Sequence, residues 1–312
     1  MDGFLPLAAS LETVSSPVMH ERTLRGAIGC RGIGLHSGRI VNVTLLPAAE
    51  GTGILFRRTD LGVDILARFD AVCDTRLCTM LAAPGRADAT IGTVEHLMAA
   101  LSASGIANIV VAVDGPELPV LDGSSEPWLF LLECAGIVDQ DAPVVAIEVL
   151  RTVRVEEGGA FAELRPGAAD CLEISMAIDF PASCIGRQTL SLSMRGDAFR
   201  EVARARTFAQ AHEIAGLRAA GLAQGGSLDN AIVVDGDKVL NPAGLRMTDE
   251  FVRHKLLDAV GDLALAGALR GRFIGNRSGH ALNNQVLRAL FADAANWRLV
   301  RADGMGWLRE AA

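Results

Sequence analysis

Short segments of alternating apolar and polar residues, separated by glycines, dominate the first part of the chain. The stretch GIGLHSGRIVNVTLLPA (32–48) joins a glycine-rich turn to an alternation of β-branched and polar residues. GILFRRTD (53–60) and VDILARF (63–69) have similar patterns. Alternation with a period of two is typical of half-buried strands, and glycine marks the turns between them. This part of the chain is therefore predicted to form short β-strands.

Two helices are predicted next. In TVEHLMAALSASG (93–105), we expect Thr93 to cap the start of a helix and Gly105 to end it. IANIVVAVDGPELPVLDGSS (106–125) is predicted to form a strand that runs into a loop, and SEPWLFLLECAG (125–136) a second helix. The first half of the chain thus proceeds from strands to a pair of helices.

The same order of elements starts again near Pro143. VVAIEVLRTVRVEE (144–157) and CLEISMAIDF (171–180) predict strands, and helices are predicted at 249–262 and, in NNQVLRALFAD, at 283–293. Strands followed by helices, twice over, predict an α+β protein of two similar domains. We expect each domain to pack a β-sheet against a pair of helices, with the active site between the domains.

The chain is long enough for two domains of this kind. Its 312 residues can bury two cores of ordinary size. The segment VDQDAP (138–143) is the predicted junction. We therefore assign residues 1–140 to an N-terminal domain and residues 141–312 to a C-terminal domain.

The composition predicts a globular cytoplasmic protein. Hydrophobic residues make up 50% of the chain and charged residues 21%, and no segment has the compositional bias of disorder. The longest apolar runs, such as NIVVAV and APVVAI, have the length of strands and fall far below the roughly 20 residues of a membrane helix. The first residues, MDGFLPLAASL, lack the basic start of a signal peptide. We expect no transmembrane segment.

Charge and cysteine content narrow the function further. The net charge of −8 argues against a nucleic-acid-binding protein, which needs a basic surface. The six cysteines form no CxxC pair and no zinc-ribbon spacing, so they are predicted to be reduced small hydrophobes. A metal site in this chain would consequently use histidine and carboxylate side chains.

The predicted helix DEFVRHKLLDAVGD (249–262) carries charged residues along one stripe. Because four residues advance the helix by a full turn plus about 40°, His254, Asp258 and Asp262 project from the same side. Apolar residues on its other sides predict that the helix is packed on more than one face. A half-buried carboxylate needs a partner such as a metal ion or a protonated histidine. By itself, however, a histidine and an aspartate at i, i+4 are more often a surface pair.

Two other segments contain residues that could complete a site. In TVEH, Glu95 and His96 are adjacent in the first turn of a predicted helix, where the helix dipole favours a carboxylate. A metal ligand beside a carboxylate that does not bind the metal lets a zinc hydrolase hold the ion and activate water together. In GNRSGHALNN, His280 follows a glycine-containing turn and can point into a cleft. For His280 considered alone, a capping or surface role is the simpler interpretation.

Together, these residues predict a catalytic metal centre. His96, His254 and Asp258 form a set of two histidines and one aspartate that leaves a fourth position open, as in catalytic rather than structural zinc sites. The i, i+4 spacing of two ligands on one helix is also the geometry of HExxH sites. Asp262, one turn beyond Asp258, could orient a histidine by accepting a hydrogen bond from its ring. His280 is the expected partner.

Seven segments of the chain closely resemble one known family. GIGLHSG, TVEHL, PELPVLDGSS, RARTF, GGSLDNAIVVD, FVRHKLLDAVGDLALAG and GHALNN have the order and spacing of the zinc-dependent UDP-3-O-acyl-N-acetylglucosamine deacetylases. The resemblance runs from about residue 21 to residue 292. It implies hydrolysis of the N-acetyl group of UDP-3-O-acyl-N-acetylglucosamine, with release of acetate, as the committed step of lipid A biosynthesis.

The resemblance also implies a role for each candidate residue. Glu95 corresponds to the general base, and His280 to the general acid or electrostatic partner, oriented by Asp262. One catalytic Zn²⁺ per chain is implied. The ligands implied for it are His96, His254 and Asp258.

Contacts with the substrate are implied in the same way. Thr207 corresponds to a residue that helps to polarise the scissile carbonyl, and Lys255 to one that meets the substrate. An insert in the C-terminal domain of the family encloses the acyl chain, and its counterpart here would begin near Phe208 and include Ile214 and Leu217.

Two alternatives stay open at this point. A zinc amidase specific for another acylated sugar would use a similar centre, and turnover of a substrate without the 3-O-acyl chain would favour it. A metal-stabilised binding module without turnover is the other alternative. The open fourth ligand position and the presence of both Glu95 and His280 argue against that module.

Overall fold

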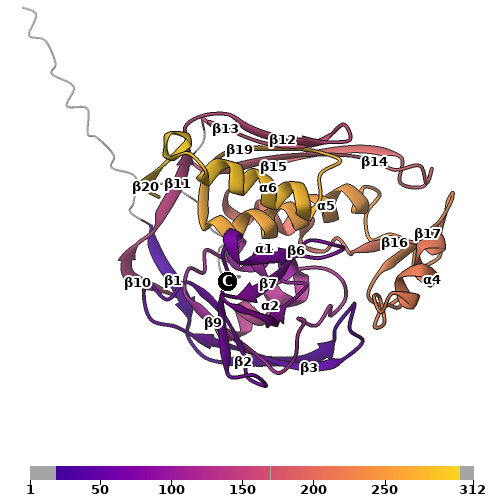
Figure 1. Cartoon of the computed structure of the whole chain (residues 1–312), viewed down its shortest axis with the longest axis horizontal. Helices are drawn as coiled ribbons and strands as arrows, with labels where there is room; N and C mark the ends of the chain where they lie inside the picture. The colour runs from indigo at the N-terminus through magenta and orange to yellow at the C-terminus, as the bar shows by residue number, and fades with distance from the viewer. Residues whose placement is uncertain (1–18, 169, 303–312) are drawn as a thin grey trace, which may run out of the picture.

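The computed structural model of the protein describes residues 19–168 and 170–302. Over these residues the chain forms five β-sheets and six α-helices, arranged as two α+β halves. Figure 1 shows the helices α1, α5 and α6 between a sheet of the first half and a sheet of the second half. The predicted fold class is thus confirmed.

The first half is built around a five-stranded sheet of order β2-β3-β9-β4-β5, in which only the β4–β9 pair is parallel. Strands β6, β7 and β8 form a smaller sheet, and β1 pairs antiparallel with β10. The bounds are β1 (His20–Leu24), β2 (Ile28–Ile33), β3 (Ile40–Pro47), β4 (Ile54–Arg58), β5 (Val63–Leu66), β6 (Val72–Asp74), β7 (Met80–Ala83), β8 (Arg86–Ile91), α1 (Glu95–Ser104), β9 (Ile109–Val113), α2 (Glu126–Ala135) and β10 (Ile137–Pro143).

The second half contains a seven-stranded sheet in which the long strand β19 pairs with β11, β13 and β14. Strands β16, β17 and β18 form a separate small sheet beside α4. The bounds are β11 (Val145–Val149), β12 (Val153–Glu157), β13 (Ala160–Arg165), β14 (Leu172–Asp179), β15 (Arg187–Ser193), α3 (Arg200–Ala203), β16 (Phe208–Gln210), α4 (Ala211–Ala219), β17 (Ile232–Asp235), β18 (Lys238–Val239), α5 (Glu250–Leu263), β19 (Ala268–Asn276), α6 (His280–Phe291) and β20 (Trp297–Arg301). Short 3₁₀ turns lie at Phe69–Ala71, Gly196–Phe199, Ala264–Ala266 and Ala294–Asn296.

The start of α1 differs from the prediction. Thr93 does not cap the helix, because its backbone is left-handed (φ 56°) and its hydroxyl donates to Oε1 of the buried Glu117 at 3.0 Å. The helix begins at Glu95 instead. Its end agrees with the prediction, since Gly105 is left-handed (φ 69°) and its N–H donates to the last turn.

Two other boundaries also differ from the sequence expectation. The last helix begins at His280 rather than at Asn283, because the extended Gly279 directly precedes its first turn. The expected junction, residues 138–143, lies within strand β10. The assignment of residues 1–140 and 141–312 to separate domains stays a prediction.

Helix α5 is almost entirely enclosed. Of its fourteen residues, only Arg253 and Lys255 are not buried. The helix packs against α1 of the first half and against α6 and β14 of its own half. The interpretation of its histidine and aspartates as a surface pair is therefore wrong, because packing on several sides removes the stripe from water.

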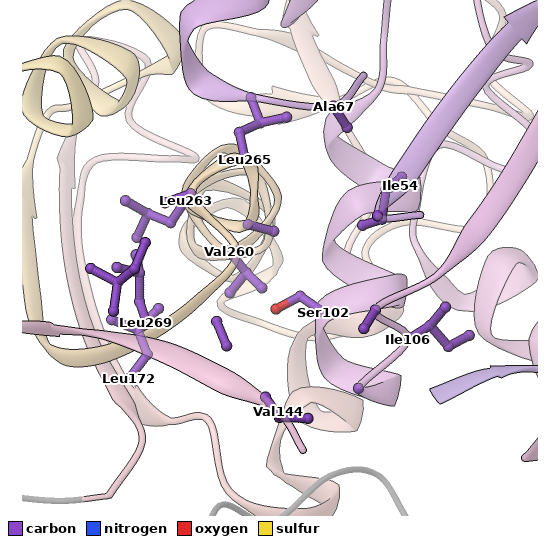
Figure 2. A pocket seen from close by; sticks show the side chains of 18 of the residues that line it. Ile54, Ala67, Ser102, Ile106, Val144, Leu172, Val260, Leu263, Leu265 and Leu269 are labelled. Carbon is purple, nitrogen blue, oxygen red and sulfur yellow. The ribbon is translucent and has the colours of Figure 1, made fainter. Parts of the chain in front are cut away.

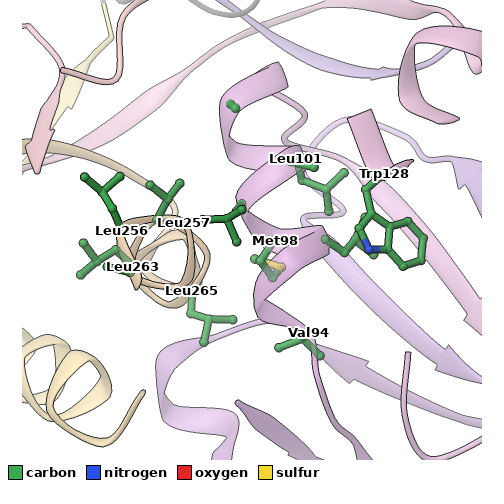
Figure 3. Close-up of a cluster of buried hydrophobic side chains, with 14 of the residues drawn as sticks. Val94, Met98, Leu101, Trp128, Leu256, Leu257, Leu263 and Leu265 are labelled. Carbon is green, nitrogen blue, oxygen red and sulfur yellow. The ribbon is translucent and has the colours of Figure 1, made fainter. Parts of the chain in front are cut away.

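Helices α1 and α5 approach each other closely at Gly261. A Cβ atom at this position would lie 2.0 Å from the carbonyl oxygen of Glu95, so only glycine allows the contact. Figure 3 shows Met98 of α1 and Leu257 of α5 in one buried apolar cluster around this crossing. The crossing places the first turn of α1 beside the polar stripe of α5.

A cavity of about 480 Å³ also lies between the two halves, at the C-terminal ends of α1 and α5. Figure 2 shows its apolar lining, with Ile54 and Ile106 from the first half and Leu263 and Leu269 from the second. Because Glu95 lies at the opposite end of α1, this cavity is separate from the polar stripe.

Two predictions from composition concern membrane helices and cysteines. Within residues 19–168 and 170–302, no helix has both the length and the apolar character needed to cross a bilayer. All six cysteines are free thiols in the structure. Cys78 and Cys171 are buried, whereas Cys73 and Cys134 are exposed.

Candidate active site

Three side chains from two helices converge in a geometry that can bind a metal ion. His96 lies in the first turn of α1, and His254 and Asp258 lie one turn apart on α5. Asp258 Oδ1 is 3.6 Å from His96 Nε2 and 3.3 Å from His254 Nε2. One possible ligand atom of each residue lies within 4.8 Å of the other two, and all three residues are buried. The fold therefore brings together the three residues that the sequence singled out.

The environment of His254 decides which ring nitrogen faces the site. Nδ1 lies 3.0 Å from the carbonyl oxygen of Ala205, which can only accept, so Nδ1 carries the proton. Burial lowers the pKa of His254 to about 4, which leaves the ring neutral near pH 7 and Nε2 with a free lone pair.

Asp258 Oδ1 is the atom that Nε2 of His254 faces. This oxygen is buried and has no hydrogen-bond partner among the described residues. A cation bound between two buried acceptors that face each other stabilises both of them. Two imidazole nitrogens and one carboxylate oxygen fit a divalent metal ion.

Glu95 lies directly beside this cluster and is suited to act as a base. It precedes His96 and is only 3% exposed. Its Oε2 accepts a hydrogen bond from the backbone N–H of Thr79 at 3.0 Å. Burial raises the pKa of Glu95, although the nearby histidines oppose the shift. A carboxylate with a raised pKa is better matched to taking up a proton near neutral pH.

His280 and Asp262 form the second polar group of the site. His280 Nδ1 lies 2.9 Å from Asp262 Oδ2, so the ring donates to the carboxylate as the sequence predicted. Asn283 Nδ2 donates to the same oxygen at 2.8 Å, and Thr79 Oγ1 donates to Asp262 Oδ1 at 2.5 Å. The other ring nitrogen, Nε2, lies 4.0 Å from Asp258 Oδ2 and thus faces the metal-binding cluster.

The charges around His280 favour its protonated form. Burial alone would lower the pKa of His280, but the charge and hydrogen bond of Asp262, together with the charges of Glu95 and Asp258, raise it to about 9. An imidazolium can donate from both ring nitrogens at once. His280 can therefore keep its bond to Asp262 while Nε2 donates a proton to a reacting group.

Lys255 and Thr207 are the two residues for which the family resemblance implies contact with the substrate or its scissile carbonyl. Lys255 Nζ donates to Asp258 Oδ2 at 2.7 Å. The partial burial of Lys255 would lower its pKa, but the charge of Asp258 raises the pKa, so the side chain stays cationic. Thr207 immediately precedes β16, and its backbone N–H donates to the carbonyl of Gly123 in the first half at 2.8 Å. Thr207 thus lies where the two halves meet, whereas Lys255 lies beside Asp258 on α5.

The three residues expected to border an acyl chain belong to the β16–α4–β17–β18 unit, which lies at one edge of the molecule in Figure 1. The Phe208 ring packs edge-on against Phe251, with its centroid 6.2 Å from that of the His254 ring. Ile214 and Leu217 are half-buried on α4, and none of the nine residues of this helix is fully buried. Phe208 therefore lies close to the metal-binding cluster, and α4 presents half-buried apolar side chains.

Three residues around the site were not singled out from the sequence. Asn283 follows His280 by one helical turn, a spacing that could have indicated it. Thr79 is separated from Asp262 by 183 residues, and nothing in the sequence relates the two. His36, in the segment GIGLHSG, has both ring nitrogens buried without a hydrogen-bond partner in the described part of the chain.

Comparison with known proteins gives one consistent result. A family model described as LpxC, UDP-3-O-acyl N-acetylglycosamine deacetylase, matches residues 21–292. Proteins named UDP-3-O-acyl-N-acetylglucosamine deacetylase from Idiomarina loihiensis and Phenylobacterium zucineum are each 48% identical to this chain. The matches cover 92% and 90% of this chain and 94% and 96% of the relatives. A relative of the same name from Acidithiobacillus ferrooxidans is 47% identical over 91% of this chain and 93% of its own length. The chain therefore belongs to the UDP-3-O-acyl N-acetylglycosamine deacetylase family.

Proposed function

We propose that this protein is a zinc-dependent deacetylase that hydrolyses the N-acetyl group of UDP-3-O-acyl-N-acetylglucosamine and releases acetate, the committed step of lipid A biosynthesis. The observation that carries the proposal is the meeting of His96, His254 and Asp258 beside Glu95 and His280. The relatives are named for this activity. Family membership thus supplies the substrate class, and the geometry supports the chemistry.

The metal would be held by His96, His254 and Asp258, one ion per chain. When bound, zinc supplies Lewis-acid chemistry that polarises the acetamide carbonyl and makes water more acidic. The ligand set leaves a fourth position open, as catalytic zinc sites do. The orphaned Asp258 Oδ1 and the inward lone pair of His254 support this assignment.

Glu95 and His280 divide the proton transfers. Glu95 accepts a proton from the attacking water, whose oxygen forms a bond to the carbonyl carbon of the acetamide. Negative charge then develops on the carbonyl oxygen, and the His280 imidazolium and the Thr207 hydroxyl stabilise it. When the carbon–nitrogen bond breaks, the sugar nitrogen takes a proton from His280 and acetate leaves. Asp262 keeps the His280 ring oriented throughout, as their 2.9 Å contact supports.

Substrate contacts follow from the positions of the remaining residues. Lys255 carries a positive charge beside the metal-binding cluster and would contact the polar part of the substrate. The acyl chain would run along Phe208, Ile214 and Leu217, because Phe208 lies near His254 and the other two present apolar surface on α4. The protein would work in the cytoplasm, in keeping with its free cysteines, and bind no nucleic acid, in keeping with its net charge of −8.

Acetate release from purified protein tests the proposal. We expect release from UDP-3-O-acyl-N-acetylglucosamine, loss of activity after chelation and recovery with Zn²⁺. UDP-N-acetylglucosamine without the acyl chain is the matched control and should react far more slowly. Equal rates on both would indicate an amidase of broader specificity. No acetate from either substrate by the zinc-loaded protein would contradict the proposal and indicate a binding module.

A further inference from the structure

Thr79 forms hydrogen bonds with two carboxylates of the site. It lies just before β7 and is 2% exposed. Its backbone N–H donates to Glu95 Oε2 at 3.0 Å, and its hydroxyl donates to Asp262 Oδ1 at 2.5 Å. Glu95 belongs to α1 in the first half and Asp262 to α5 in the second. A single residue therefore joins the base of the proposed reaction to the carboxylate that orients its acid.

The hydroxyl of Thr79 binds the carboxylate oxygen of Asp262 that His280 does not contact. His280 Nδ1 and Asn283 Nδ2 both donate to Oδ2, at 2.9 and 2.8 Å, whereas Thr79 donates to Oδ1. Hydrogen bonds at both oxygens fix the plane of the carboxylate. Without the bond at Oδ1, the group can rotate and the His280 ring can rotate with it. Such supporting contacts are what keep a reactive histidine in one orientation.

The backbone of Thr79 holds Glu95 independently of the Thr79 side chain. Its N–H donates a hydrogen bond to Glu95 Oε2. Its carbonyl accepts a hydrogen bond from the N–H of Val94, at the start of α1, at 3.4 Å. A substitution that preserves the backbone therefore leaves the contact with Glu95 in place. Side-chain variants of Thr79 can consequently isolate the link to Asp262.

We infer that Thr79 is a positioning residue that holds the base Glu95 and the Asp262–His280 pair in register across the two halves of the molecule. It acts through these groups and does not touch the reacting atoms. The inference rests on the proposed function for the reaction and on the three hydrogen bonds of Thr79 for the geometry. It assigns Thr79 a role in kcat rather than in substrate binding.

Substitution of Thr79 by valine or by serine separates the contribution of the hydroxyl to turnover from that of the methyl group. Thr79→Val keeps the shape and should lower kcat by about 10- to 100-fold, the usual cost of losing a supporting contact, while KM changes by less than about twofold. Thr79→Ser keeps the hydroxyl and should recover most of the turnover. Thr23→Val is the matched control, because Thr23 is also buried and its hydroxyl oxygen accepts one hydrogen bond away from the site. Equal losses of kcat in Thr79→Val and Thr79→Ser, or none in either, would overturn the inference.

A double-mutant cycle shows whether Thr79 acts through Asp262. In an Asp262→Ala background the Thr79 hydroxyl has no carboxylate to bind. Adding Thr79→Val should therefore lower kcat by less than about twofold. A further loss as large as that in the wild-type background would show an independent effect and contradict the inference.

A measurement without substrate separates this inference from the proposed function. The ring N–H of His280 that donates to Asp262 can be followed by proton NMR of the full chain at constant pH. We expect Thr79→Val to shift or broaden this resonance, and Thr23→Val to leave it unchanged. An unmoved resonance in a folded Thr79→Val protein would refute the positioning role, even if the wild type proves to act on another substrate. Should Thr79→Val fail to fold, the same spectrum of Thr79→Ala decides the point.

Discussion

At the scale of single residues, the opposite protonation of Glu95 and His280 predicts a bell-shaped dependence of the rate on pH. Glu95 must be ionised to take a proton, so the rate rises as pH passes its pKa, which burial raises. His280 must be protonated, so the rate falls as pH rises through its pKa of about 9. Measured limbs belong to the coupled site rather than to isolated groups. A pH–rate profile of the metal-loaded enzyme checks the shape.

Two variants test the assignment of the alkaline limb. His280→Ala should retain the metal, lower turnover by roughly 10²- to 10⁴-fold and flatten the alkaline limb. Asp262→Asn should move that limb to lower pH, because the imidazolium loses its carboxylate partner. Metal content is measured alongside. An unchanged alkaline limb in His280→Ala would identify another group as the acid.

At the scale of elements, the α1–α5 crossing predicts a large effect of a single methyl group. In Gly261→Ala the new Cβ would lie 2.0 Å from the Glu95 carbonyl oxygen, so the helices must separate. We expect the free energy of unfolding to fall by about 1–3 kcal/mol and turnover to fall as Glu95 moves. Urea unfolding and kcat measure the two effects.

Gly216 of α4 is the matched control for this substitution. A Cβ there would meet nothing within 4 Å. Gly216→Ala should therefore raise stability by about 0.5–1 kcal/mol through helix propensity alone. If Gly261→Ala is as stable and active as the wild type, the two helices are not held at this distance in solution.

Helix α4 predicts how the length of the acyl chain affects binding. Each buried methylene contributes about 0.8 kcal/mol, so shortening the chain should raise KM steeply. Leu217→Glu should weaken long-chain substrates selectively and thus reduce this dependence. Ala215→Glu, an exposed position on the same helix, is the control. Equal losses for short and long chains would remove Leu217 from the acyl passage.

At the scale of the whole molecule, the metal would join the two halves. His96 comes from the first half, whereas His254 and Asp258 come from the second. An ion that binds only the folded state stabilises it by about 2.7 kcal/mol at 100 times its Kd, so chelation should lower the unfolding midpoint by roughly 5 °C or more. Calorimetry with and without chelator measures the shift. His254→Ala should bind little metal and not respond to chelator. A wild-type midpoint that chelation leaves unchanged would contradict a bridging ion.

The sequence alone determined much of the molecule, because the decisive signals are local. The period of a helix placed His254, Asp258 and Asp262 on one stripe, and the spacing of short motifs indicated the family. Alternation predicted strands such as β3, whose Val41 and Val43 are buried. Helix and strand periods are properties of neighbouring residues, so they can be recognised without knowing what packs against them.

Only the tertiary structure decided what surrounds that stripe. Packing on several sides turned a possible surface pair into a buried one, and burial then shifted the pKa values of His254 and Glu95. The contact of Thr79 with Asp262 joins residues 183 positions apart. The hydrogen bond from the Thr93 hydroxyl to Glu117, formed in place of a helix cap, is another contact of this kind. Hydrogen bonds between distant segments have no period or local pattern in the sequence, because they depend on how α1, α5 and the β6–β7 segment come together in three dimensions.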